Sequence, residues 1–113
     1  MIYLGNAFAL SMVDENCVIE VNTLSEDEVL EKLKNGFTSI VGHQSTSLLY
    51  SNLLGIKIPM NRTTLMLKKD DILIVGQYVG PRLEEGVIDL PENSTIIWKM
   101  VRMEPGSNNS REK

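Results

Sequence analysis

The sequence predicts a single α/β (α+β) domain, with a mixed sheet of about five or six strands and two main packed helices. Short aliphatic and β-branched runs alternate with segments of helical periodicity, and glycines or polar turns separate them. A chain of 113 residues also has the usual length of one domain. We place the domain at residues 1–104 and expect residues 105–113, which have nothing to bury, to form a disordered tail.

The first part of the chain reads as two strands and a helix. Residues 2–8 and 17–21 are apolar runs on either side of a polar turn, and we expect these two strands to pair. Ser25 is a typical N-cap, and Glu28 three residues later completes a capping box. A helix is therefore predicted over residues 26–34, ending at Asn35-Gly36.

The middle of the chain predicts a strand, a sharp turn and a second helix. Residues 37–41 are partly β-branched and bounded by glycines, which is typical of a buried central strand. The chain then turns at Gly42-His43 into a helix over residues 45–54. Leu49 and Leu53 lie on one side of that helix, and Gly55 can end it.

The last part of the chain reads as a hairpin, a turn and a final strand. Residues 63–67 and 72–79 flank the polar turn at residues 68–71, which favours a hairpin. Residues 80–86 look like a single helical turn with Pro81 at its first position. Residues 95–103 predict a last strand around Trp98.

Composition excludes several classes of function. The 11 basic and 15 acidic residues give a net charge of −4, and no basic cluster exceeds Lys68-Lys69, so binding to long nucleic acid is disfavoured. With one histidine and one cysteine, the chain offers no typical metal site, and we expect neither a metal nor a cofactor. No apolar run has the length of a membrane helix and no basic leader precedes the first run, so we expect no membrane segment and a cytoplasmic protein.

His43 is the strongest candidate for chemistry, because histidine is the side chain whose ordinary pKa lies closest to neutrality. It directly precedes a predicted helix, whose first N–H groups form a ready anion site. Three polar segments follow predicted strands, and they would meet at one rim of the sheet if those strands are neighbours and roughly parallel. This rim would carry Asn6, His43, Gln77, Arg82 and Glu85.

Such a set could cleave a phosphodiester without metal, by attack of a ribose 2′-hydroxyl on its adjacent phosphate. His43 would protonate the departing 5′-oxygen, and Arg82 would hold the charge on the phosphoryl oxygens. Plainer interpretations remain open. A histidine at a helix start is often a cap, Asn6 suits a turn, and Arg82 with a nearby glutamate is commonly a solvated pair. The residues alone indicate an anion-binding domain with possible acid–base chemistry.

An ordered set of motifs resembles a known family. Asn6-Ala7-Phe8, Gly42-His43-x-Ser45-Thr46 and Arg82-Leu83-Glu84-Glu85-Gly86 are similar to the small viral anti-CRISPR ring nucleases of archaeal viruses and their relatives in phages, integrative elements and type III CRISPR loci. The resemblance leaves out only the tail. It implies a homodimer that binds cyclic tetra-adenylate (cA4), the messenger of type III CRISPR defence. The homodimer would cut this ring without metal into linear di-adenylate, and so antagonise or reset the signal in the host cytoplasm.

The resemblance also assigns roles to individual positions. His43 matches the general acid of the family, and Arg82 and Glu85 match its active-site arginine and glutamate. The expected ligand contacts are Asn6, Ala7, Gln44, Ser45, Thr46 and Gln77. The chain departs from the family at Ala9, where a serine is usual, and at Pro81, where a glutamine often precedes the arginine. The alternative function is a non-catalytic dimeric module of a mobile element that binds a nucleotide or a protein.

Overall fold

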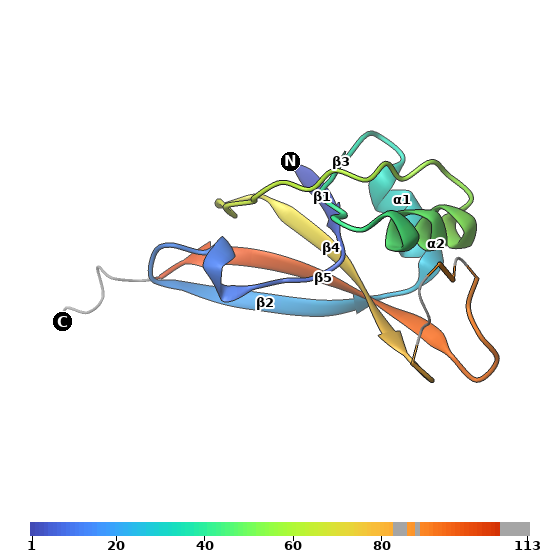
Figure 1. Ribbon diagram of the computed structural model, residues 1–113. Helices are drawn as coiled ribbons and strands as arrows, with labels where there is room; N and C mark the ends of the chain where they lie inside the picture. The colour runs from blue at the N-terminus through green and yellow to red at the C-terminus, as the bar shows by residue number, and fades with distance from the viewer. Residues whose placement is uncertain (83–85, 88, 107–113) are drawn as a thin grey trace.

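The computed structural model describes residues 1–82, 86–87 and 89–106, which form one α+β domain. Within them lie a five-stranded mixed sheet and two α-helices, and this confirms the predicted fold class. Residues 107–113 of the predicted tail lie outside the described residues. In chain order the elements are β1 (Ile2–Gly5), the 3-10 helix η1 (Leu10–Met12), β2 (Cys17–Leu24), α1 (Glu26–Leu33), β3 (Thr38–Ser39), α2 (Gln44–Leu54), β4 (Ile72–Val79) and β5 (Thr95–Pro105) (Figure 1).

The strands lie in the order β2-β5-β4-β1-β3. β1 runs parallel to both β3 and β4, whereas β5 is antiparallel to its two neighbours, β4 and β2. The carboxyl ends of the parallel strands β1, β3 and β4 therefore lie at the same end of the sheet, which we call the carboxyl end. The predicted pairing of residues 2–8 with residues 17–21 is wrong, because β5 pairs with β2 along its whole length and separates it from β4 and β1.

The two faces of the sheet are covered by different parts of the chain. α1 and α2 lie on one face, as Figure 1 shows, and the core beneath them includes Leu4, Val29, Tyr50 and Trp98. The other face has its own core, in which Leu65 and Leu67 pack on the sheet together with Phe8 and Met12. We call these the helix face and the second face.

α1 forms as the sequence predicts. The side chain of Ser25 accepts a hydrogen bond from the backbone N–H of Glu28 at 3.1 Å, and the Glu28 carboxylate accepts one from the Ser25 N–H at 2.8 Å. Leu24 and Val29, on either side of this capping box, are both buried in the helix-face core. The helix starts at Glu26, as predicted, and its last residue is Leu33, one before the predicted end.

Part of the second face is not covered by any of the described residues. The strand pairing places Val21, Val79 and Ile97 on the same face as the buried Val101, but beyond the reach of η1 and residues 63–67. Val21 is 54% exposed and Val79 is 44% exposed. We call this region the open half-face; its residues are Val21, Thr23, Gln77, Val79, Thr95, Ile97 and Lys99.

The predicted central strand at residues 37–41 is wrong in position and length. β3 contains only Thr38 and Ser39 and lies at an edge of the sheet. Ile40 and Val41 are buried, but the Val41 carbonyl accepts a hydrogen bond from the backbone N–H of Asn61 at 2.7 Å. An irregular segment therefore covers Ile40 and Val41. They are buried like residues of a central strand, although they belong to no strand.

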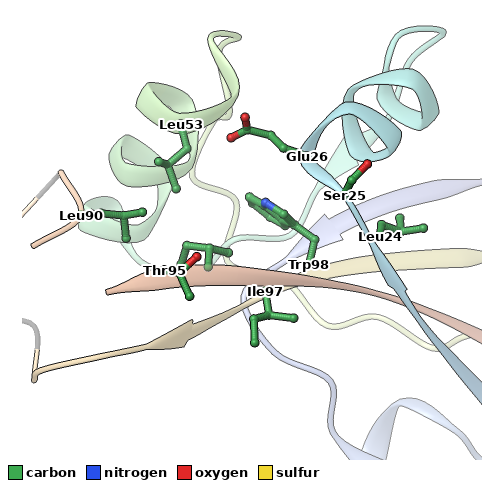
Figure 2. A pocket seen from close by; sticks show the side chains of 9 residues that line it. Leu24, Ser25, Glu26, Leu53, Leu90, Thr95, Ile97 and Trp98 are labelled. Atoms are coloured by element: carbon green, nitrogen blue, oxygen red, sulfur yellow. The ribbon is translucent and has the colours of Figure 1, made fainter. Parts of the chain in front are cut away.

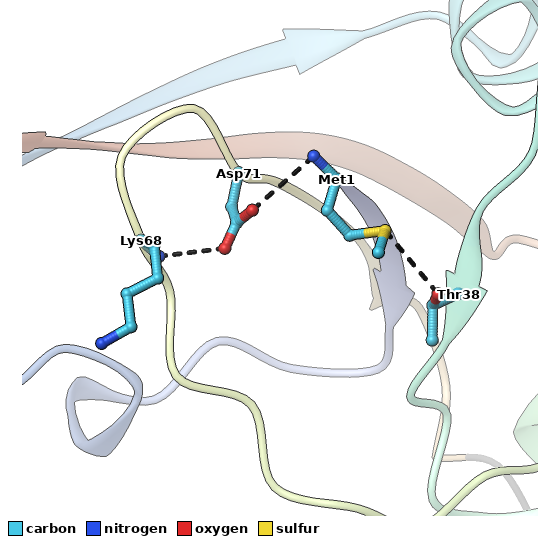
Figure 3. A network of polar contacts seen from close by, with 4 residues as sticks. All are labelled: Met1, Thr38, Lys68 and Asp71. Atoms are coloured by element: carbon cyan, nitrogen blue, oxygen red, sulfur yellow. Dashed lines mark hydrogen bonds and ion pairs between the residues drawn. The ribbon is translucent and has the colours of Figure 1, made fainter.

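The predicted hairpin is wrong in its first arm. The turn exists, because the N–H of Lys68 donates to the Asp71 carboxylate at 3.0 Å, and the same carboxylate lies 3.6 Å from the amino group of Met1 (Figure 3). Residues 63–67 nevertheless form no strand, and the N–H of Leu67 donates to the Met12 carbonyl. β4 already has β1 and β5 at its two sides, so it has no edge left for a hairpin partner.

Two further boundaries differ from the prediction. β1 ends at Gly5, four residues into the chain's first apolar run, and Phe8 packs instead against the second-face core. β5 continues to Pro105, two residues past the predicted end. In the predicted helical turn at residues 80–86, Gly80, Pro81 and Arg82 are not helical, while residues 83–85 lie outside the described residues.

Candidate functional site

The segments after β1 and β3 meet at the carboxyl end of the sheet. Asn6 directly follows β1, and its side-chain oxygen accepts a hydrogen bond from the N–H of Gly42 at 3.1 Å. Gly42 in turn directly precedes His43, the N-cap residue of α2. The structure thus brings together two of the three polar segments that the sequence singled out.

Arg62 joins this site, and sequence reasoning missed it. Its Nε and Nη2 atoms both donate to the Gly42 carbonyl, at 3.2 and 3.1 Å. The neighbouring Asn61 holds Arg62 in place, because its side-chain amide donates to the Ser39 carbonyl at 2.7 Å. The Gly42 residue is consequently held by Asn6 on its N–H and by Arg62 on its carbonyl.

His43 is exposed at the start of α2, with a φ of −132° and a ψ of 135°. Its carbonyl accepts the first helical hydrogen bond, from the Ser47 N–H at 3.0 Å, but its side chain makes no capping bond. The first turn of α2 contains no acidic residue, so no carboxylate offsets the positive end of the helix dipole there. The imidazole has no recorded partner in the described part of the chain, and it can meet a ligand.

Two pockets adjoin Asn6. The His43 pocket has a volume of about 430 Å³ and is lined by Asn6, Ala7, Met12, Ile40, Gly42, His43, Arg62 and Thr63. The Tyr78 pocket has a volume of about 190 Å³ and is lined by Asn6, Thr46, Leu49, Tyr50, Gly76, Tyr78 and Ile96. One pocket thus carries the imidazole and the guanidinium, and the other has mostly apolar and aromatic walls.

The other predicted ligand contacts are placed unevenly. Ala7 lines the His43 pocket and Thr46 lines the Tyr78 pocket. Gln44 is exposed and Ser45 half-buried in the first turn of α2, and neither lines the two pockets. Gln77 projects from the second face, because side chains alternate along β4, and its neighbour Tyr78 takes the position on the α2 side.

Arg82 and Glu85 follow β4. Arg82 is exposed and does not line either pocket. The hydroxyl of Tyr78 donates to the Pro81 carbonyl and so fixes the start of the turn that carries Arg82. Glu85 lies outside the described residues, and its role and that of Arg82 stay predictions.

Tyr50 forms the wall between the site and the core. Its hydroxyl accepts from the Gly76 N–H at 3.1 Å and lies 3.4 Å from the Gly5 carbonyl, so α2 is tied to both β1 and β4. A Cβ at Gly76 would come within 2.7 Å of the Tyr50 hydroxyl, and glycine is therefore needed there. Burial raises the pKa of Tyr50 from its ordinary 10.0 to about 12, although the Gly76 N–H lowers it in part.

Neither a metal cluster nor a membrane helix is found in residues 1–82, 86–87 and 89–106. No group of three or more histidine, cysteine, aspartate or glutamate side chains could hold a metal ion there. No helix in this part of the chain is long and apolar enough to span a bilayer.

The sequence is similar to a family of viral proteins. The family model described as STIV B116-like matches residues 2–96. "Uncharacterized protein 26" of Sulfolobus islandicus filamentous virus is 34% identical over 90 residues, covering 78% of this chain and 75% of that protein. "Uncharacterized protein ORF117" of Acidianus two-tailed virus is 29% identical over 91 residues, covering 78% of this chain and 77% of that protein.

A solved structure gives the same result. B116 of Sulfolobus turreted icosahedral virus superposes with a TM-score of 0.74 at 25% identity, covering 89% of this chain and 97% of that chain. These relatives come from viruses of archaea, and the solved B116 structure has the fold described above. The chain belongs to the STIV B116-like family.

Proposed function

We propose that this protein is a metal-independent ring nuclease that cleaves cA4 to linear di-adenylate and thereby antagonises or resets type III CRISPR signalling. The observation that carries the proposal is the environment of His43. Its exposed imidazole has no capping bond and lines a pocket of about 430 Å³ that also contains the Arg62 guanidinium. An acid beside a fixed cation is what phosphodiester cleavage without a metal requires.

The reaction forms one bond to phosphorus and breaks another. The ribose 2′-oxygen attacks the adjacent phosphate and the bond to the 5′-oxygen breaks, which leaves a 2′,3′-cyclic phosphate at one new end and a 5′-hydroxyl at the other. Two such cuts convert the ring into two linear di-adenylates, each with a 2′,3′-cyclic phosphate. His43 donates a proton to the departing 5′-oxygen. We assign the proton of the attacking hydroxyl to Glu85, and the developing phosphoryl charge to Arg82 and Arg62.

A small anion can be held by this acidic chain because the donors are local. The chain has a net charge of −4, but the site combines the start of α2, which lacks acidic residues in its first turn, with the guanidinium of Arg62. Coulomb attraction between groups in contact outweighs the screened field of distant surface carboxylates. The Tyr78 pocket next to Asn6 has apolar walls that suit a nucleobase.

The proposal includes a homodimer, and the open half-face supports it. Lys99 is the only charged residue of the open half-face, and its amino group donates to Thr23 at 2.8 Å. Val21 and Val79 are exposed apolar side chains at its two ends and Ile97 lies between them, so an interface on this surface would bury apolar area. A second copy is a compatible occupant, because C2 pairing sets this nearly uncharged surface against itself.

The decisive experiment compares wild type and His43→Ala with labelled cA4 in the presence of EDTA. We expect wild type to cleave, and the variant to cleave roughly 10²–10⁴-fold more slowly while still binding the ring, because only the proton donor is lost. Lys57→Ala, which alters an exposed residue outside both pockets, is the control and should keep the wild-type rate.

Two outcomes would contradict the proposal. If His43→Ala changed the rate of cA4 cleavage by less than about threefold, the imidazole would have no role as the acid in the mechanism. Binding of cA4 without any turnover in wild type would instead identify a non-catalytic binding module.

A further inference from the structure

A third pocket lies on the helix face, between the start of α1, α2 and β5. It has a volume of about 400 Å³, and we call it the indole pocket because Trp98 forms its floor (Figure 2). Leu24, Leu53 and Leu90 contribute apolar walls from three different segments. It shares Ile96 with the Tyr78 pocket but contains none of the residues assigned to cleavage.

The indole N–H of Trp98 is a buried donor that no described residue pairs. Trp98 is only 3% exposed, and the described part of the chain provides no recorded acceptor for its Nε1. Figure 2 shows the nitrogen edge of the ring facing the gap between the two helices, on the side of Glu26 and Leu53. A buried tryptophan N–H usually finds a partner, since leaving it unpaired is costly.

Glu26 supplies the complementary group at the same pocket. Its carboxylate lines the pocket and has no recorded partner among the described residues. Glu28 differs, because its carboxylate is occupied by the Ser25 N–H. The pocket thus offers one donor, at Trp98, and one free acceptor, at Glu26.

The charge at the pocket decides which ligands can enter. Glu26, Asp27 and Glu28 all lie in the first turn of α1, so three carboxylates oppose an anion there. A phosphate or carboxylate ligand is therefore disfavoured, although the start of a helix would otherwise attract one. The indole N–H requires an acceptor from the ligand, and Glu26 requires a donor.

We propose that the indole pocket binds a small uncharged ligand with an apolar body and a single edge that carries both an acceptor and an N–H donor. Aromatic carboxamides and amino-substituted heterocycles share this edge. The acceptor meets Trp98 Nε1–H, the donor meets the Glu26 carboxylate, and the ring packs against the leucines. This binding does not depend on cleavage of cA4.

The chain contains one tryptophan, so a single indole N–H resonance reports on the pocket. We would titrate ¹⁵N-labelled protein with benzamide and with adenine, which carry the two versions of the edge. Saturable binding with a downfield shift of the indole resonance is expected for at least one probe. The probe that binds more tightly shows whether the pocket prefers an aromatic carboxamide or an amino-substituted heterocycle. Benzoate, which has the body of benzamide but is an anion without a donor, should leave the resonance in place.

Two matched variants locate the ligand. Glu26→Ala should weaken binding of the positive probe at least about fivefold, because a hydrogen bond to a charged group is lost. Asp27→Ala removes a charge from the same turn but not from the pocket, and it should bind like wild type. Neither change touches the core, so both variants should fold.

An indole resonance that neither probe moves would overturn the proposal, as it would identify a cavity that holds solvent only. Equal effects of benzoate and benzamide would also overturn it. So would equal weakening by Glu26→Ala and Asp27→Ala, because a general charge effect would then explain the binding. Failure of cA4 cleavage would leave these results unchanged, and the two proposals are therefore tested separately.

Discussion

At the scale of residues, the site depends on how Gly42 is held. Asn6 accepts from its N–H and Arg62 donates twice to its carbonyl, so the residue before His43 is fixed from two sides. A guanidinium has five N–H groups, and this contact uses only two of them. Arg62 can therefore position the turn and still present donors to a phosphate in the His43 pocket.

This double role predicts the effect of Arg62→Ala. Loss of a charged donor to phosphate costs about 1.5–3 kcal/mol, so we expect cA4 to bind roughly 10–100-fold more weakly. The matched control is Arg102→Ala, a half-buried arginine on β5 that does not line the His43 pocket. Its Nε lies 3.8 Å from a carboxylate oxygen of Glu20, and its Nη2 lies 3.9 Å from one of Glu104. Isothermal calorimetry with both variants checks the prediction, and equal affinities would contradict it.

The sequence identified His43 but not Arg62, for a physical reason. His43 is recognisable locally, since it is the only histidine and stands where an apolar run gives way to helical periodicity. Arg62 reaches Gly42 from 20 residues away through the hydrogen bonds of Asn61, and no local pattern encodes that approach. Gln77 shows the reverse error, because a residue near a strand end can project from either face.

At the scale of elements, the Tyr50 hydroxyl provides a hydrogen-bond acceptor for β4 beyond the end of β1. β1 ends at Gly5, opposite Val75, while β4 continues to Val79. The Tyr50 hydroxyl receives the N–H of Gly76, just beyond the last β1 residue, and its ring packs edge-on against Trp98 with centroids 4.9 Å apart. One side chain of α2 thus completes the hydrogen bonding of β4 where its strand partner stops.

Tyr50 also predicts how stability depends on pH. Its pKa in the folded protein is about 12, against 10.0 for an ordinary tyrosine. The unfolded chain therefore loses this proton first, and the stabilisation is fully present below pH 10 and is lost as the pH rises towards 12. This difference in pKa corresponds to a loss on the order of 3 kcal/mol in the free energy of unfolding once Tyr50 is ionised in both states.

Tyr50→Phe is the matched variant for this measurement. We expect it to be less stable than wild type by about 1–3 kcal/mol at pH 8, because the Gly76 N–H loses its acceptor. The difference should shrink as the pH is raised, since phenylalanine does not titrate. Urea unfolding of both proteins from pH 8 to pH 11.5 tests this, and parallel pH profiles would show that Tyr50 does not titrate as stated.

Elements defined by local chemistry were predictable from the sequence, and elements defined by distant partners were not. The capping box of α1 and the glycine end of α2 depend on adjacent residues, and both occur as expected, with Gly55 at a φ of 71°. Residues 63–67 have a strand-like composition, but β4 has no free edge to pair with them. Strand order is set by the whole sheet, so neither this failure nor the edge position of β3 could be read locally.

At the scale of the whole molecule, the open half-face predicts where two copies meet. An aspartate in place of an apolar side chain that an interface buries leaves an unpaired buried charge, which costs roughly 2–5 kcal/mol. Val21→Asp should therefore sediment as a monomer at concentrations where we expect wild type to be a dimer. Val18→Asp is the matched control, because Val18 is 62% exposed on the same strand but on the opposite face, and it should stay dimeric.

Sedimentation velocity with circular dichroism checks this prediction and confirms that both variants fold. A dimer that tolerates Val21→Asp would place the contact elsewhere. A wild type that stays monomeric at every concentration would remove the homodimer from the proposed function.

The position of β5 in the sheet has a consequence for synthesis in the cell. β5 is the last of the five strands in chain order, yet it alone connects β2 to the rest of the sheet, with Cys17 opposite Pro105. Until β5 has been translated, β2 has no strand to pair with, and its valines stay exposed in the nascent chain while β3 and β4 are made. A chain whose translation ends before Thr95 would thus have an unpaired edge on β2, and chaperones and proteases would act on it.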